Sequence, residues 1–168
     1  NEATISAQNS PSLTVVSGTL GQLTQMETWL DRAGIDHKRL GAAKAYHSEM
    51  MRPVREEYLN VVSDCRFHPP ALPLISNVSG TWMTETQAAN PEYWADHMEG
   101  AVLFTQGIEE IEETIQQPLF VEIGVGASLT NLMRQILKSE QQAVTTLFDP
   151  QSGDDESMLI RKSLAEMW

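Results

Sequence analysis

Cysteine occurs only once in this chain of 168 residues, at Cys65. A single thiol excludes an internal disulfide and a cysteine cluster for zinc, so we expect a reducing compartment, with the cytoplasm as the default. The sequence also lacks a run of about 18 apolar residues that could span a bilayer. Its polar opening, residues 1–4, has neither the charged nor the apolar region of a secretory signal. These absences predict a soluble cytoplasmic protein with no membrane partner.

Basic side chains are also scarce. Eleven Lys and Arg residues stand against 23 Asp and Glu residues, which gives a net charge of -12. Nucleic-acid binding depends on the release of counterions by Lys and Arg, so this charge argues against a nucleic-acid partner. The excess of acid lies in residues 67–168, whereas residues 1–66 are almost balanced. An anionic partner would favour the first part, although acids that only solvate helix faces explain the same pattern.

Several motifs of known enzyme classes are absent or incomplete. The glycine turn at residues 124–128 resembles a phosphate cradle, but it lacks the third glycine of a dinucleotide site and the Gly-Lys-Ser/Thr ending of a nucleotide loop. Tight packing between strand and helix is therefore the favoured use of these glycines. Ser128 does not have glycine two residues away on both sides, because Thr130 stands at the second of these positions, so it does not fit a nucleophile elbow. The four histidines show no metal-ligand spacing.

Apolar residues at helical or strand spacing predict an alternation of strands and helices. Thr19 can cap a helix that Gly34 ends, and Pro53 is tolerable in the first turn of another helix. Strands are expected at residues 13–17, 35–40, 74–78, 119–123 and 143–148, and helices at residues 19–33, 49–62, 91–98, 102–115, 129–137 and 156–168. With residues 13–40 as a β-α-β unit, this order predicts an α/β fold with a mainly parallel sheet.

One histidine is a candidate for chemistry. His47 follows a short connection rich in glycine and alanine, and an imidazole there could act as a general base. Such a base needs a nucleophile to deprotonate and a group that fixes its tautomer. Because the chain has no serine nucleophile in a tight strand-to-helix turn, the residues predict half of an active site, with the missing part upstream.

Five motifs in the right order resemble the acyltransferase domain of modular polyketide synthases, almost from end to end. Residues 7–18 resemble the family's "AxNxP…VVSG" segment, and residues 45–54 resemble "HAFHSxxMxPV". Residues 74–80 are similar to "xxSNVTG", residues 93–104 to "YWxxHLrxPVxF", and residues 121–130 to "VEIGPGxxLT". The ordered set makes the resemblance far more specific than one histidine would.

The resemblance implies an α/β fold that combines part of an α/β-hydrolase-like large subdomain with part of a ferredoxin-like small subdomain. Residues 1–45 would belong to the small subdomain, and residues 46–168 to the large subdomain and the region after the acyltransferase. The implied reaction moves a malonyl-type extender unit from coenzyme A to an acyl carrier protein by a Ser-His ping-pong mechanism. We expect no cofactor bound by this chain; the substrates are a coenzyme A thioester and the phosphopantetheine of the carrier.

The family's catalytic serine, its oxyanion-hole glutamine and the arginine that pairs with the extender carboxylate match no residue here. We therefore expect them upstream of Asn1, and we expect the chain alone to be inactive. The implied partners are the acyl carrier protein, malonyl-CoA or a similar thioester, the N-terminal half of the acyltransferase domain, and neighbouring synthase domains.

Two histidines carry the implied catalysis. His47 matches the family's catalytic histidine, which takes the serine proton, returns one to the leaving thiol, and later activates the thiol of the carrier. His97 matches the position whose main-chain carbonyl or side chain holds that imidazole in its productive tautomer. The alternative for His97 is a histidine at a helix end with no catalytic part.

Four further residues are implied at the substrate site. Tyr46 stands where phenylalanine usually accompanies malonyl and serine accompanies methylmalonyl, and its large ring favours malonyl by excluding an α-methyl group. Lys44 departs from the family's histidine or tyrosine, and it would either meet a carboxylate or face water. Asn77 and Asn9 match family asparagines near the cleft, whereas turn capping before Gly80 is the alternative for Asn77.

Two rival functions remain open from the sequence. The related malonyl transferase of fatty acid synthesis is a second enzyme interpretation, which the segments at residues 76–80 and 93–98 make less favourable. An inert acyltransferase-like scaffold or carrier-docking module is the interpretation of another class, and a serine nucleophile outside these residues would distinguish it.

Overall fold

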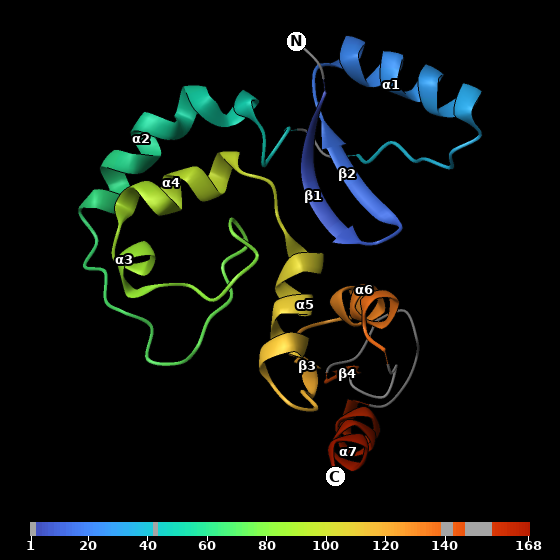
Figure 1. The fold of residues 1–168 in the computed structure, drawn as a ribbon, viewed down its shortest axis with the longest axis vertical. Coiled ribbons are helices and arrows are strands. Elements are labelled where there is room, and N and C mark those ends of the chain that lie inside the picture. Colours follow the sequence, from blue (N-terminus) through green and yellow to red (C-terminus); the bar gives the residue numbers. More distant parts are fainter. Residues whose placement is uncertain (1–2, 42–43, 139–142, 147–155) are drawn as a thin grey trace. The chain divides into compact units, whose positions relative to one another are not determined.

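The computed structural model of the chain describes residues 3–41, 44–138, 143–146 and 156–168, and it divides into two compact units, Asn1–Phe104 and Thr105–Trp168. The first unit contains β1 Thr4–Ser10, β2 Leu13–Ser17, α1 Leu20–Ala33, the 3-10 turn η1 Glu49–Met51, α2 Arg52–Ser63, α3 Glu85–Ala88 and α4 Pro91–Glu99 (Figure 1). Helix α5 Phe104–Thr114 begins at the boundary, and β3 Phe120–Glu122, α6 Ser128–Ile136, β4 Ala143–Thr145 and α7 Glu156–Met167 follow. The subdomain boundary expected after residue 45 is not where these units separate, and it stays a prediction.

The first unit begins with an antiparallel hairpin. Strand β1 pairs with β2 from Thr4 opposite Ser17 to Ser10 opposite Leu13, with two irregularities of register. The strand at residues 13–17 is confirmed, but β1 was not predicted. The sequence of β1 does not show the apolar alternation typical of a strand, because β1 buries Ser6 and Ser10 and exposes Ile5. The Ser6 hydroxyl donates to the Val15 carbonyl, which compensates the burial of a polar group.

Helix α1 has the predicted ends, but no strand follows it. Thr19 and Gln22 form a capping box, and Gly34 ends the helix in the left-handed region at φ 67°. The β-α-β unit is wrong, since residues 35–40 form no strand in the described structure. Ile35 N–H instead donates back to the Leu30 carbonyl, and Arg39 reaches back to Glu27 with two hydrogen bonds of 2.8 and 2.6 Å. These contacts return the chain to α1 rather than to a sheet.

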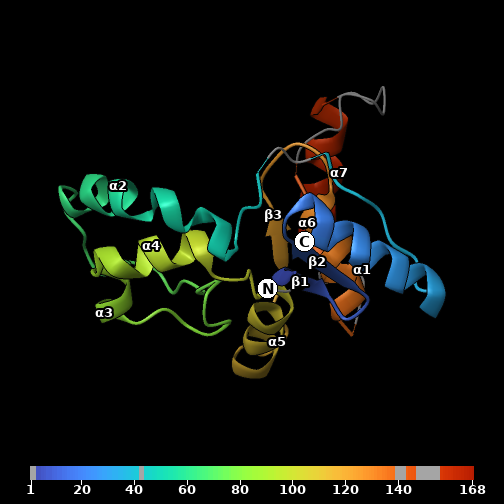
Figure 2. The same cartoon turned by 90° about the horizontal axis from the view of Figure 1, so that it is seen from above.

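Helices α2 and α4 confirm two further predictions and lie side by side (Figures 1 and 2). Pro53 lies in the first turn of α2, where its missing N–H costs nothing. Asn90 caps α4 by accepting a hydrogen bond from Glu92 N–H, and Pro91 opens the helix. This pair of helices carries the candidate site.

The strand expected at residues 74–78 is wrong, because a tight turn replaces it. Ser76 is fully buried, and its hydroxyl oxygen accepts hydrogen bonds from the N–H groups of Val78 and Ser79 and from the Tyr93 hydroxyl. Gly80 has φ 66°, which reverses the chain. Only one antiparallel bridge, Ile75 opposite Trp82, forms in this described segment. The turn thereby fixes α4 through Tyr93.

In the second unit β3 and β4 pair in parallel, and Glu122 closes the turn between β3 and α6. Its carboxylate accepts hydrogen bonds from Leu129 N–H at 3.1 Å and Thr130 N–H at 2.8 Å. The amides that would cradle a phosphate are therefore taken by a side chain. The packing explanation for the glycines is also wrong, since a Cβ on Gly124 or Gly126 would meet nothing within 4 Å among the described residues. Gly126 is required instead by its φ of 87°.

Of the predicted mainly parallel sheet, the described residues contain one parallel strand pair, β3–β4, and one isolated parallel bridge between Ala7 and Val102, whereas β1 and β2 pair in antiparallel. Residues 147 and 148 of the predicted last strand lie outside the described residues. Helices α5, α6 and α7 lie where the apolar spacing predicts them. Among the helices that the structure describes, none is both long enough and apolar enough to cross a membrane.

Replacing Glu122 by glutamine should lower the free energy of unfolding by about 1 kcal/mol at pH 7, because an amide oxygen caps α6 less well than a carboxylate. Burial raises the pKa of Glu122, but hydrogen bonds from Thr130 and Leu129 outweigh it and hold that pKa below 4.5. The stabilisation is therefore present above about pH 4.5 and lost as pH falls through the lower folded-state value. Urea unfolding at several pH values measures this, with exposed Glu113→Gln as the control; an equal loss in both variants would contradict it.

Candidate active site

His47 lies in the connection before η1 and has an unusual backbone conformation. Its φ of 57° is in the left-handed region, which costs free energy for a residue with a Cβ. Its N–H donates to the Met98 carbonyl at 3.2 Å. The buried Ser48 fixes the following turn, since its hydroxyl donates to the Ala45 carbonyl at 2.6 Å and accepts from Met50 N–H. Local hydrogen bonds on both sides thus hold His47 in a conformation that it would otherwise avoid.

The ring of His47 is held by main-chain oxygens. Its Nδ1 lies 3.1 Å from the His97 carbonyl oxygen and 3.1 Å from the Gly100 carbonyl oxygen. Neither oxygen carries a hydrogen, so Nδ1 must be the protonated nitrogen that donates. Nε2 then bears the free lone pair of the neutral imidazole. This is the tautomer that a general base acting through Nε2 requires.

These acceptors are available because α4 ends here. The last carbonyls of a helix have no partner within it, and the C-terminus carries partial negative charge. Gly100 N–H closes the helix on the Asp96 carbonyl at 2.7 Å, while the carbonyls of His97 and Met98 accept from His47. The same helix end would stabilise the imidazolium formed when Nε2 takes up a proton.

The segment after α4 is fixed from both sides. Val102 joins β1, with its carbonyl accepting from Gln8 N–H at 2.8 Å and its N–H donating to the Ser6 carbonyl at 3.0 Å. Leu103 N–H donates to the Asn77 carbonyl at 2.8 Å. The Gly100 carbonyl therefore belongs to a connection anchored on a strand and a turn. These contacts restrict the positions that the Gly100 carbonyl can take.

The side chain of His97 is a neighbour of His47 rather than a hydrogen-bond partner. The two rings meet edge to face at 87°, with centroids 5.7 Å apart. The pKa of His97 lies below 6.5. Burial is the larger cause, and the charge of His47 is the smaller one. The second imidazole is thus kept neutral beside the first, which avoids two adjacent positive charges.

The other residues implied by the sequence differ in how far they are exposed. Tyr46 and Lys44 are exposed, and Tyr46 is held through its carbonyl, which accepts from the Ser17 hydroxyl at 3.4 Å. Asn9 is half-buried at an irregular register of β1. Asn77 has an exposed side chain, and Ser76 rather than Asn77 caps the turn before Gly80.

Sequence reasoning missed the second carbonyl acceptor, at Gly100. A glycine directly after a predicted helix is a signal for a helix end, but no sequence pattern tells which distant side chain that end will bind. In the described ranges of the chain, no three His, Cys, Asp or Glu side chains gather in a way that could hold a metal ion.

Comparison with known proteins identifies the family. The model of the acyl transferase domain family matches residues 1–163. The chain belongs to the acyltransferase domains of polyketide synthases. The spectinabilin polyketide synthase system protein NorB of Streptomyces orinoci is 32% identical over 86% of this chain and 6% of its own length. A non-reducing polyketide synthase, pks27, of Aspergillus flavus is 31% identical over 99% of the chain and 8% of its own length.

Solved acyltransferases share the fold and confirm the α/β prediction. The acyltransferase domain of SpnD, solved with 2-(pent-4-yn-1-yl)malonyl, matches with a TM-score of 0.93 and 32% identity over 99% of this chain and 41% of that chain. The acyltransferase domain of ZmaA matches with a TM-score of 0.88 and 28% identity, over 99% and 38%. FabD from Acinetobacter baumannii shares the fold, with a TM-score of 0.82 at 19% identity, over 98% and 49%. This acyltransferase chain thus spans less than half the length of these solved proteins.

Proposed function

We propose that this acyltransferase moves a malonyl-type extender unit from coenzyme A to the phosphopantetheine thiol of an acyl carrier protein, with His47 as the general base. The observation that supports this most is the pair of carbonyls 3.1 Å from Nδ1, which leaves Nε2 free to take a proton. The serine nucleophile would come from a segment outside these 168 residues. That segment, the N-terminal half of the domain, and neighbouring synthase domains are the implied protein partners.

The proposed reaction has two transfers. Nε2 of His47 takes the serine hydroxyl proton while the serine oxygen attacks the thioester carbonyl, and the same proton passes to the departing coenzyme A sulfur. The carrier thiol then gives its proton to Nε2 and attacks the acyl-serine, and the serine oxygen recovers a proton. His97 would act through its main-chain carbonyl by holding the imidazole, as the third group of a triad does.

The remaining assignments are also part of the proposal. Residues 1–45 would form part of the ferredoxin-like small subdomain, and residues 46–168 part of the large subdomain and the region after it. Asn9 and Asn77 would support the cleft from β1 and from the Ser76 turn, and Lys44 would meet a carboxylate or face water. The scarcity of cysteine favours the cytoplasm as the place of the reaction.

We expect a preference for malonyl over methylmalonyl, because the ring of Tyr46 would occupy the space of an α-methyl group. Tyr46→Ser should therefore shift the ratio of kcat/KM toward methylmalonyl-CoA by about tenfold, the scale of one methylene in a pocket. Tyr58→Ser, which removes another partly exposed tyrosine, on α2, is the matched control. An unchanged ratio in Tyr46→Ser would contradict this role of Tyr46.

The test of the function itself uses the complete gene product that contains these 168 residues. Radiolabelled malonyl-CoA and methylmalonyl-CoA are supplied with an acyl carrier protein, and label on the synthase and on the carrier is measured. Label that passes first to the synthase and then to the carrier would support the two-transfer mechanism. No label from either substrate would favour an inert scaffold or a docking module.

A further inference from the structure

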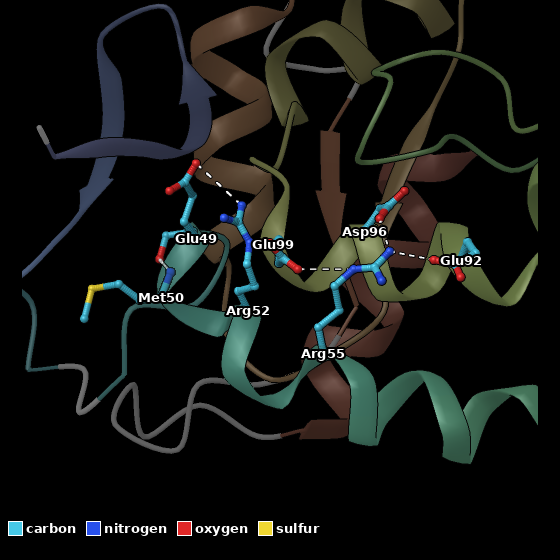
Figure 3. A network of polar contacts seen from close by, with 8 residues as sticks. Glu49, Met50, Arg52, Arg55, Glu92, Asp96 and Glu99 are labelled. Carbon is cyan, nitrogen blue, oxygen red and sulfur yellow. Dashed lines mark hydrogen bonds and ion pairs between the residues drawn. The ribbon is translucent and has the colours of Figure 1, made fainter. Parts of the chain in front are cut away.

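A polar cluster joins α2 to α4 on the side of the first unit shown in Figure 3. Arg55 is its centre. Its Nη2 lies 2.7 Å from Glu92 Oε2 and 2.6 Å from Asp96 Oδ1, and its Nε lies 3.2 Å from Glu99 Oε1. One guanidinium from α2 thus contacts three carboxylates spread over the length of α4.

Glu99 depends on this contact more than an ordinary surface carboxylate would. Its side chain is only 16% exposed, and Arg52 meets its other oxygen, Oε2, at 3.4 Å. Glu99 Oε1 is buried without a hydrogen bond among the described residues, so the charge of Arg55 is what offsets its loss of water. Without Arg55, the acids at positions 92, 96 and 99 would repel one another along one helix face.

Apolar burial on α2 is limited, with Leu59 and Val62 half-buried. None of the described side chains of α2 is buried, and its residues Val54, Tyr58 and Val61 are exposed. Polar contacts must therefore provide much of the specificity with which α2 lies on α4. The hydrogen bonds that Arg55 donates to Asp96 and then to Glu92 raise the pKa of Arg55 further above its ordinary value, so its charge is permanent.

The contacted acids are next to the groups that bind His47. Asp96 directly precedes His97, and Glu99 directly precedes Gly100, and the carbonyls of His97 and Gly100 are the two acceptors of His47 Nδ1. His47 itself is joined to α2 through η1. Arg55 therefore connects the element that carries the base with the helix end that carries its acceptors.

We propose that Arg55 is a positioning residue for His47, which keeps the end of α4 at hydrogen-bonding distance from the imidazole. This inference rests on the proposed role of His47 as general base. Arg55 touches no reacting atom, so its loss should alter the geometry of the base while the binding of the coenzyme A thioester is retained.

The experiment compares variants of the complete gene product. Arg55→Met keeps the length of the side chain but removes its charge, and it should lower kcat by about 10-fold to 100-fold, the cost of misplacing a catalytic group. KM for malonyl-CoA should stay within about twofold because the thioester contacts are kept. The nitrogen-15 resonances of the His47 ring, assigned by comparison with His47→Ala, should show loss of the single Nδ1–H tautomer.

Matched controls lie in the same unit. Arg39→Met removes another arginine that binds a carboxylate twice, that of Glu27 on α1, and should leave kcat unchanged. Glu92→Gln removes the ion pair of Arg55 that is furthest in sequence from His97. It should therefore affect kcat less than Glu99→Gln does. If Arg55→Met lowers the thermal stability too far to assay, the order of Glu92→Gln and Glu99→Gln decides the question.

The outcomes separate this inference from the proposed function. If His47→Ala abolishes transfer while Arg55→Met behaves like Arg39→Met, the positioning role is overturned and the function stands. If His47→Ala transfers normally, the proposed function fails first. A fall in kcat with an unchanged tautomer signal would also overturn the positioning role, because the base would then be unmoved.

Discussion

Replacing His47 by alanine is expected to lower acyl transfer by about 10³-fold, within the range that a general base contributes. The variant removes Nε2, the only ring nitrogen that the structure leaves free for a proton, since Nδ1 is committed to the carbonyls of His97 and Gly100. It also leaves those two carbonyls without their donor. The loss of Nε2 acts on the step in which the nucleophile is deprotonated.

The measurement is the rate of labelling of the synthase and of the carrier by malonyl-CoA. His37→Ala is a fitting control, because His37 also places its Nδ1 by a main-chain carbonyl, that of Ile35 at 3.1 Å, but has no part in the site. We expect the control to keep full activity. Similar rates in the two variants would show that His47 is not the base.

Replacing Ser76 by alanine should lower the free energy of unfolding by about 3 kcal/mol, because each buried donor left without a partner costs about 1–3 kcal/mol. The Ser76 hydroxyl oxygen accepts from Tyr93 Oη at 2.7 Å and from the N–H groups of Val78 and Ser79 at 3.2 and 3.1 Å. The residue has no exposed surface, so water cannot replace the lost oxygen. The expected loss of free energy of unfolding is therefore large for the removal of one oxygen atom.

Urea unfolding monitored by tryptophan fluorescence measures this loss. Ser79→Ala provides the comparison, since its hydroxyl pairs only with that of Thr81 among the described residues, at 2.9 Å, and it is half-buried. We expect it to cost less than about 1 kcal/mol. Equal losses in the two variants would mean that the Ser76 oxygen is not the anchor of the turn. Since Tyr93 belongs to α4, Ser76→Ala should also lower transfer activity.

The longer helices of this protein could be predicted because their signals are local, whereas the four-residue α3 was missed. Thr19 and Gly34 mark the ends of α1, and Asn90 with Pro91 marks the start of α4. The strands were harder to predict, because a strand depends on partners that lie far away in the sequence. Residues 35–40 are apolar enough for a strand but fold back on α1, and β1 escaped prediction because it buries serines and exposes Ile5.

Some parts of the candidate site could likewise be predicted from the sequence, and others could not. His47 could be identified from its sequence surroundings, and His97 was expected to hold it by either its carbonyl or its side chain. The Gly100 acceptor and the part proposed for Arg55 could not be foreseen, because a main-chain oxygen leaves no trace in the sequence. The contact of Arg55 with three acids of α4 depends on how two helices lie together, which spacing within one helix does not reveal.

The acceptors of His47 belong to the main chain, so substitution of the residues that carry them does not by itself remove the acceptor oxygens. A carboxylate partner can be deleted by one codon change, but every residue at positions 97 and 100 supplies a carbonyl. Substitution there removes the acceptor only by bending the helix end, as a Cβ on Gly100 would tend to do, lying 3.1 Å from the Asp96 carbonyl oxygen. Loss of the catalytic tautomer should therefore follow from substitutions that reshape the backbone at the end of α4, rather than from the removal of one side chain that accepts the hydrogen bond.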